Sequence, residues 1–304
     1  MIKKIHPYQT RQSMLTNEYE IFHFSDTKLD KVSLHHHDFY ECYLFLSGDV
    51  TYIIEGKSYS LMPGDIILIN SKELHQPIIN HTDKPYERIV LWINRVYLDS
   101  LSTASTDLKR CFEDADKKNV IRSDYEAQQN VRAIMNKLLS LENYKGFGQE
   151  LLYKAYLIEL FVFLNTLLFQ GETKLTIEIK KSNLIDEIIS YINSHLEEEI
   201  SIDMLSEQFY ISKYHLLREF KKHSGTTIHK FIVQKKLILA KEFILNGLPI
   251  NIVYERAGFG GYSNFFKAFK KEYGMTPKQF YELMKRGDAP SEETHPVITE
   301  ALLP

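Results

Sequence analysis

The sequence predicts a multidomain α and β protein: an N-terminal antiparallel β-barrel with a helical segment, followed by an all-α C-terminal domain. At 304 residues the chain is long enough for two domains. Short β-branched and aromatic runs alternate with turn residues up to about residue 93, and apolar residues recur at helical spacing after about residue 124. Residues 210–286 hold 15 Lys/Arg against 5 Asp/Glu, whereas residues 1–209 hold 22 against 31. This asymmetry favours an anionic polymer as the partner of the basic segment, although a solvated basic face is the alternative.

The barrel is predicted from strands that are too short and too closely spaced for an α/β fold. The expected strands are residues 40–46, 51–54, 58–61, 66–69 and 88–93. Turn sequences separate them, namely Ser47-Gly48-Asp49, Glu55-Gly56-Lys57 and Pro63-Gly64-Asp65. Such strands must close or cover their edges, and a barrel does so.

Composition excludes several classes of protein. Apolar residues make up 44% of the chain and charged residues 25%, which is typical of a globular protein and not of a disordered or fibrous one. No run of about 18 apolar residues is present, so no membrane span is expected, and the N-terminus does not resemble a secretory signal. The two cysteines, Cys42 and Cys111, cannot form a disulfide framework. A cytoplasmic location is therefore expected.

Two helices are expected between residues 124 and 170, separated by Gly146 and Gly148. The first carries its apolar residues on one stripe, and the second is apolar over much of its circumference. The residues at helical spacing are Val131, Ile134, Leu138 and Leu141, then Leu151, Leu152, Ala155, Ile158 and Val162. The second helix needs more than one surface to bury against, which predicts a homodimer contact; an intrachain hairpin alone is the alternative. We assign residues 1–175 to the first domain, 171–182 to a linker, 183–286 to the second domain and 287–304 to a disordered tail.

The second domain contains two helix-turn-helix segments, at residues 201–222 and 252–271. In the first, Ser212 is placed to cap a helix whose inner face carries Leu216 and Phe220. In the second, Phe265 and Phe269 lie four residues apart and face inward. Both second helices end in Phe-Lys-Lys-x-x-Gly. Between the two units, Thr226 or Thr227 caps a spacer helix of about 20 residues, or roughly 30 Å, close to the spacing of about 34 Å between successive major grooves.

The run from Gly258 to Pro277, with Gly-Phe, Ser263, Phe-x-Lys-x-Phe-Lys-Lys and Gly-Met-Thr-Pro, resembles the C-terminal signature of AraC/XylS-type transcription regulators. The resemblance implies that each recognition helix enters a major groove of double-stranded DNA. By position, base contacts would come from Tyr214, Leu217, Arg218, Tyr262, Asn264 and Lys267, and phosphate contacts from Lys213, Lys221, Lys222, Lys270 and Lys271. Three positions depart from the family pattern: Ser206 and Tyr254 replace a small Ala, and Gly261 replaces an acidic cap.

A histidine cluster marks the first domain. His35, His37 and Glu41 form H-x-H-x-x-x-E and share parity along an extended chain, and His75 follows later. This set resembles the metal site of cupin domains, and its donors suit zinc, iron, manganese or nickel. AraC-type sensor domains resemble cupins and often keep such residues without a metal. The alternatives are a pocket in which these four residues and Tyr43 bind a small effector such as a sugar, or packed histidines with no ligand role.

The leading hypothesis is a dimeric DNA-binding transcription regulator that responds to a small molecule in the barrel. The resemblance adds RNA polymerase as a partner and favours an activator, although no residue separates activation from repression or names the effector or operator. The competing hypothesis is a metal-dependent cupin enzyme that catalyses oxidation or isomerisation. An enzyme has no need for two basic helix-turn-helix units, so we expect no enzymatic activity and no obligatory cofactor. A third possibility is a constitutive DNA-binding protein whose barrel only dimerises.

Overall fold

The computed structural model describes residues 13–29, 32–80, 83–169 and 183–286. The chain divides into two compact units, Met1–Lys180 and Lys181–Pro304, which are described separately. The linker and the C-terminal tail expected from the sequence lie outside the described residues.

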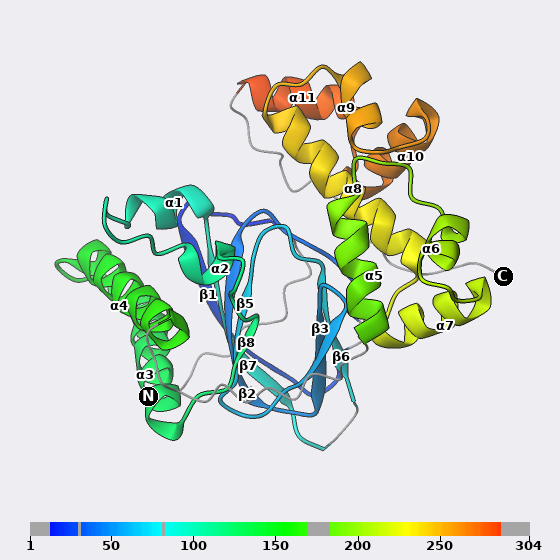
Figure 1. Ribbon diagram of the computed structural model, residues 1–304. Coiled ribbons are helices and arrows are strands. Elements are labelled where there is room, and N and C mark those ends of the chain that lie inside the picture. The colour runs from blue at the N-terminus through cyan, green and yellow to red at the C-terminus, as the bar shows by residue number, and fades with distance from the viewer. Residues whose placement is uncertain (1–12, 30–31, 81–82, 170–182, 287–304) are drawn as a thin grey trace. The chain divides into compact units, whose positions relative to one another are not determined.

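The first unit contains two antiparallel sheets that face each other (Figure 1). The larger sheet has the order β1-β7-β2-β5-β8 and the smaller the order β4-β3-β6. The strands are β1 (Tyr19–Asp26), β2 (Tyr40–Ser47), β3 (Val50–Ile54), β4 (Lys57–Ser60), β5 (Ile66–Ile69), β6 (His75–Ile79), β7 (Tyr86–Ile93) and β8 (Val120–Ile121). The five strands predicted from the sequence are all present, and β1, β6 and β8 are additional.

Strand β2 shows how the sheets divide the core. Its odd-numbered residues Tyr43 and Phe45 point between the sheets, into an aromatic interior shared with Tyr52 of the smaller sheet. Its even-numbered residues, such as Cys42 and Leu44, point outward and join a second core beneath the helices. Because successive side chains alternate across a strand, both faces of β2 are buried.

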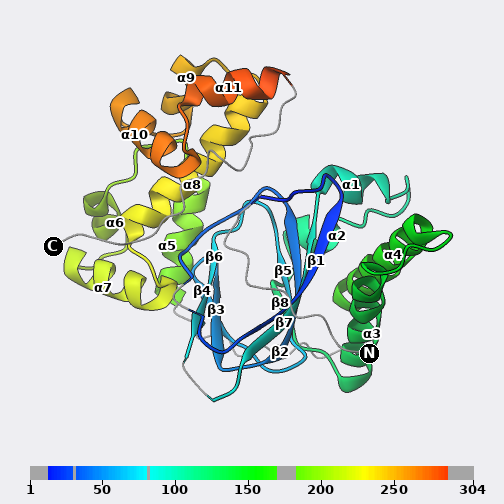
Figure 2. The ribbon, with the colours of Figure 1, turned by 180° about the vertical axis from the view of Figure 1, so that it is seen from behind.

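Helices cover the outer face of the larger sheet (Figures 1 and 2). They are α1 (Arg95–Ser100), α2 (Arg110–Glu113), α3 (Tyr125–Leu141) and α4 (Gln149–Phe169). The helix α3 begins at Asp124, whose side chain accepts a hydrogen bond from the backbone N–H of Ala127 at 2.8 Å. By length and apolar composition alone, α4 is the only helix in the described part of the chain that could cross a membrane. One side of it, including Leu157, Phe161 and Leu164, is fully buried in the core with α3 and the sheet.

The second unit is all-helical, as the sequence predicts. Its helices are α5 (Asn183–Ser194), α6 (Ile202–Gln208), α7 (Lys213–Ser224), α8 (Ile228–Leu245), α9 (Ile250–Arg256), α10 (Tyr262–Tyr273) and α11 (Pro277–Arg286). Ser212 and Thr227 cap α7 and α8, each accepting a hydrogen bond from a first-turn N–H. Thr276 and Gln279 cap each other at the start of α11, where Pro277 occupies the first helical position.

Candidate nucleic-acid interface and ligand site

The helix α7 presents one face to solvent, on which basic residues lie beside Tyr214 and Leu217. Its inner face buries Leu216 and Phe220 completely, and its C-terminus closes on Gly225, whose φ of 69° is the left-handed conformation that favours glycine. The 3.6-residue period then turns the remaining side chains outward. The predicted contact residues of this helix are all exposed: Lys213, Tyr214, Leu217, Arg218, Lys221 and Lys222.

Arg218 has protein partners of its own on this face. Its Nε donates to Oε1 of Glu219 at 3.1 Å, and its guanidinium lies 5.7 Å from the ring centroid of Tyr214. Burial would raise the pKa of Glu219, but the Arg218 hydrogen bond and nearby cations outweigh it, and the pKa is lowered. The guanidinium is therefore held among groups on the helix surface while 56% of the side chain stays exposed.

The helix α10 repeats the design of α7. Phe265 and Phe269 are fully buried, with ring centroids 5.5 Å apart, and the helix ends at Gly274 with φ of 70°. Its N-cap is Gly261, which offers no side-chain cap. The predicted contact residues are again all exposed: Tyr262, Asn264, Lys267, Lys270 and Lys271.

The spacer α8 joins the two helix-turn-helix units through packed side chains. Phe231 meets Phe220 of α7 edge-on, with ring centroids 5.5 Å apart. Further along, Leu237 and Ala240 belong to the same buried cluster as Phe265 and Phe269 of α10. The 18 residues of α8 span about 27 Å at about 1.5 Å per residue. A spacer of this length is close to the distance of about 34 Å between successive major grooves on one side of B-DNA.

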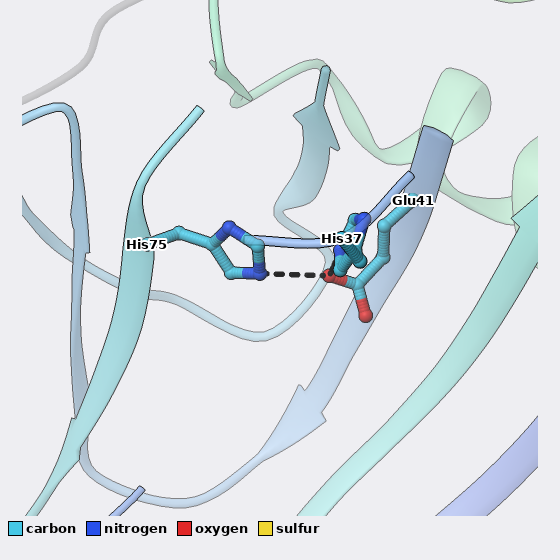
Figure 3. Close-up of side chains that lie close together, drawn as sticks. All are labelled: His37, Glu41 and His75. Atoms are coloured by element: carbon cyan, nitrogen blue, oxygen red, sulfur yellow. Dashed lines mark hydrogen bonds and ion pairs between the residues drawn. The ribbon is translucent and has the colours of Figure 1, made fainter. Parts of the chain in front are cut away.

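A buried histidine–carboxylate cluster lies between the two sheets of the first unit (Figure 3). Glu41 comes from β2 of the larger sheet, His75 from β6 of the smaller one, and His37 from the segment before β2. Their ligand atoms all lie within 4.8 Å of one another. Oε2 of Glu41 is 3.4 Å from Nε2 of His37 and 3.5 Å from Nε2 of His75.

Backbone carbonyls fix the tautomers of these histidines. Nδ1 of His37 lies 2.8 Å from the Phe39 carbonyl oxygen, and Nδ1 of His75 lies 2.9 Å from that of Glu73. A carbonyl oxygen only accepts, so each Nδ1 carries the proton and each Nε2 is left to face the carboxylate. Nε2 of His75 has no hydrogen-bond partner among the described residues. Burial lowers the pKa of His75 well below its usual value, which keeps that nitrogen unprotonated.

The other residues predicted for this site lie nearby with different contacts. The ring of His35 lies against that of His75, with centroids 4.3 Å apart, but His35 is outside the set whose ligand atoms converge. Tyr43 points into the same interior, and its hydroxyl bonds that of Tyr86 at 2.5 Å. Trp92 donates from Nε1 to Oε1 of Glu41 at 3.1 Å. No sequence signal identified this contact, because it depends on the pairing of β7 with β2.

Each of the two units matches a known protein family. A family model described as an AraC-like ligand binding domain matches residues 19–161, and one described as a helix-turn-helix domain matches residues 205–282. The chain belongs to the AraC/XylS family of transcription regulators.

Individual AraC/XylS relatives are distant. The HTH-type transcriptional activator RhaS of Salmonella paratyphi A is 23% identical over 253 residues, which are 80% of this chain and 85% of RhaS. Among solved structures, fatty acid-bound ToxT of Vibrio cholerae is 15% identical, covers 91% of this chain and 99% of its own, and gives a TM-score of 0.40. The DNA-binding domain of AdpA, solved with a target DNA, is 18% identical, covers 36% of this chain and 100% of its own, and gives a TM-score of 0.33.

The departures from the AraC/XylS pattern have visible structural consequences. Ser206 is buried, and its Oγ has no hydrogen-bond partner in the described part of the chain. Tyr254 is partly exposed, its hydroxyl donates to Glu255 at 3.0 Å, and its ring meets that of Tyr262 edge-on with centroids 5.7 Å apart. Tyr254 thus packs against the edge of the core and against the first residue of α10.

One exposed aromatic residue of the first helix-turn-helix turn was missed by the sequence analysis. Tyr210 is 95% exposed and has a φ of 51°, a left-handed conformation that is uncommon outside glycine. It lies in the turn between α6 and α7, and Tyr214, in the first turn of α7, is also exposed, at 73%. The sequence held no signal for this exposure, because aromatic residues in a short turn more often pack inward.

Proposed function

We propose that this AraC/XylS-type regulator binds one DNA site with two recognition helices, α7 and α10, and activates transcription from it. The observation that carries this proposal is the match between the two helices. Each buries a pair of apolar residues and leaves every predicted contact residue in solvent. The excess of Lys and Arg in residues 210–286 supports a polyanionic partner. Activation, and with it contact to RNA polymerase in the cytoplasm, is proposed by analogy with RhaS.

A homodimer is proposed through α4. The four residues Leu151, Ala155, Ile158 and Val162 are all exposed and recur at intervals of three or four residues, so they form one stripe. Leu151 is 67% exposed, Ile158 37% and Val162 43%. A continuous apolar stripe on a helix whose other side is already buried is the pattern of an interface between subunits.

The ligand of the sensor unit is proposed to be a divalent transition metal bound by His37, Glu41 and His75. Ligands of a tetrahedral zinc at about 2.1 Å lie about 3.4 Å apart. The distances of 3.4 and 3.5 Å from Oε2 of Glu41 to the two Nε2 atoms meet this requirement. The carbonyls that hold each Nδ1 supply the outer contacts that orient metal-binding imidazoles.

A small organic effector such as a sugar remains the competing ligand. It would use the same histidines, with Tyr43, as hydrogen-bonding groups. We favour the metal because a donor–donor distance of about 3.4 Å suits one ion. A metal in this place would act as a signal, and we propose no enzymatic reaction, since the family relatives are transcription regulators.

The decisive experiment selects binding sites from a randomised duplex library with the full-length protein, with and without zinc. A two-box operator, protected over two successive major grooves on one side of the DNA, is the expected result. A protein that binds all duplexes equally would contradict the proposal. Zinc that changes occupancy would support metal sensing, and a sugar that does so in metal-free protein would support the competing effector.

A further inference from the structure

The middle of α8 carries a buried lysine. Lys236 is 5% exposed, although lysine is among the residues least often buried. Its Nζ donates to the backbone carbonyl oxygen of Glu198 at 2.7 Å and to that of Gly258. Burial lowers the pKa of its ammonium group, and nearby Glu199 opposes this shift.

The two carbonyls belong to segments that are far apart in the sequence. Glu198 lies in the segment between α5 and α6, directly before the first unit, and Gly258 follows α9 in the second unit. Lys236 itself belongs to the spacer between the units. One side chain therefore bonds both the segment that leads into the first unit and the turn of the second unit.

The segment that leads into the first unit also approaches the second unit very closely at this point. Gly258 has a φ of 68°, and a Cβ added there would fall 2.3 Å from the carbonyl oxygen of Leu196 and 2.5 Å from that of Glu198. No side chain fits in that space. At the edge of the contact, Arg256 pairs with Glu197 at 3.2 Å. The segment 196–198 is thus pressed directly against the turn that precedes the second recognition helix.

We propose that Lys236 is a positioning residue that fixes the separation and rotation of α7 and α10, and thereby sets the number of base pairs between the two boxes that the protein accepts. This inference rests on the proposed two-box mode of DNA binding. Adding one base pair between the boxes moves the second box by about 3.4 Å and turns it by about 35°. Recognition helices held rigidly by the Lys236 bonds cannot shift to contact both boxes at the altered spacing. Helices joined only through the packing of α8 can shift part of that distance.

The test measures binding of full-length protein to labelled duplexes by fluorescence anisotropy. The duplexes carry the selected operator, the same operator with one or two base pairs inserted or removed between the boxes, and a version with one box scrambled. The variants are Lys236→Met, which keeps the stem and removes the ammonium, and Gly258→Ala, whose added Cβ would crowd the segment 196–198 and lie 2.8 Å from Nζ of Lys236, so that it disrupts the same junction from the other side. Lys230→Met is the matched control, because Lys230 is an exposed lysine of the same helix.

Wild-type protein and Lys230→Met are expected to lose at least about tenfold in affinity when the spacing changes by one base pair, since the second box then no longer adds avidity. Lys236→Met and Gly258→Ala are expected to bind the selected operator about tenfold more weakly than wild type does. Changing the spacing should then weaken each variant by less than about a further threefold, and binding of each variant to the single-box duplex should stay close to that of wild type. A wild-type spacing profile in a folded Lys236→Met protein would overturn the inference, as would wild-type protein that shows no spacing preference. Absence of any sequence preference in the wild type would instead refute the two-box function itself.

Discussion

Nε of Arg218 donates to Oε1 of Glu219 at 3.1 Å, one residue further along the same recognition helix. The pair sits at the surface, with 56% of the Arg218 side chain exposed. The guanidinium keeps free donors, because Arg carries five N–H donors, and only two of them are used, by Glu219 and by a contact of 3.4 Å between Nη2 and Nδ1 of His215. The forked face that could pair with guanine O6 and N7 remains available.

We therefore expect Arg218→Ala to cost about 1–3 kcal/mol on the selected operator and to relax preference at one base position. Glu219→Gln should have a smaller effect and keep the preference, because it loosens the guanidinium without removing it. Binding to a randomised library, read by sequencing, measures both. If Arg218→Ala keeps full preference at every position, Arg218 only pairs with Glu219 and does not read bases.

Lys270 is expected to act on phosphate. It is exposed on the last turn of α10, beyond the residues nearest the N-terminus of that helix. Lys270→Ala should weaken binding to all sequences to a similar degree and reduce the slope of log affinity against log salt by about one unit. Lys145→Ala, which removes an exposed lysine from the loop between α3 and α4, is the control and should leave the slope unchanged. A Lys270→Ala protein with altered base preference would assign that residue a base contact.

Local signals in the sequence accounted for much of the second unit. The caps at Ser212, Thr227 and Thr276 and the inward positions of Phe265 and Phe269 depend on residues within one or two helical turns, and all are confirmed.

The first unit was less predictable because its contacts are distant in sequence. Strand β6 was missed since Pro77 interrupts its pattern, and the structure places this strand at a sheet edge, where proline is tolerated. On α4, the sequence gives two apolar stripes of similar quality. Which of them meets the sheet is set by tertiary packing, and Leu157 and Phe161 face inward while Ile158 and Val162 face out.

The exposed stripe of α4 leads to a prediction about assembly. Ile158→Glu places a charge at the centre of the stripe, where burial against a second copy would remove it from water at high cost. We expect the variant to sediment as a monomer at micromolar concentrations at which the wild type is a dimer. Val96→Glu is the matched control, because Val96 is an exposed aliphatic residue, 76% exposed, on α1. If Ile158→Glu sediments as a dimer like the wild type, the interface between subunits does not include the exposed stripe of α4.

The carboxyl group of Glu272 predicts a pH dependence of stability. Burial raises its pKa above the usual value, and the hydrogen bond from Gln234 at 2.6 Å and three nearby lysines only partly offset this effect. A raised pKa means that the folded state binds the proton more tightly than the unfolded state. The stabilising contribution is therefore complete below the unfolded pKa of about 4.3 and is lost as the pH rises through the folded pKa.

Glu272→Gln removes the ionised form, so the variant should melt at a higher temperature than wild type at pH 8, and the difference should vanish near pH 4. Glu282→Gln, which changes an exposed glutamate of α11, should show no such trend. Circular dichroism melts of both variants across this range measure the effect. A Glu272→Gln protein that is less stable at pH 8 would mean that the carboxylate is held as a charged partner of the lysines.

Trp92 gives a direct reading of the proposed metal site, because it is the single tryptophan of the chain and its Nε1 donates to Glu41 at 3.1 Å. An ion that binds Glu41 draws electron density from the carboxylate and weakens this hydrogen bond, so the tryptophan emission should change as zinc or nickel is added to metal-free protein. His37→Ala should weaken the metal affinity at least about 100-fold, since even outer contacts of metal ligands contribute 10- to 100-fold. His23→Ala is the matched control, because it removes a buried histidine that pairs with a different carboxylate, Glu87, at 2.8 Å. If neither metal changes the Trp92 emission of the wild type, or if His37→Ala and His23→Ala have the same metal affinity, then these residues do not bind a metal. The cluster would then bind an organic effector through hydrogen bonds or serve only in packing.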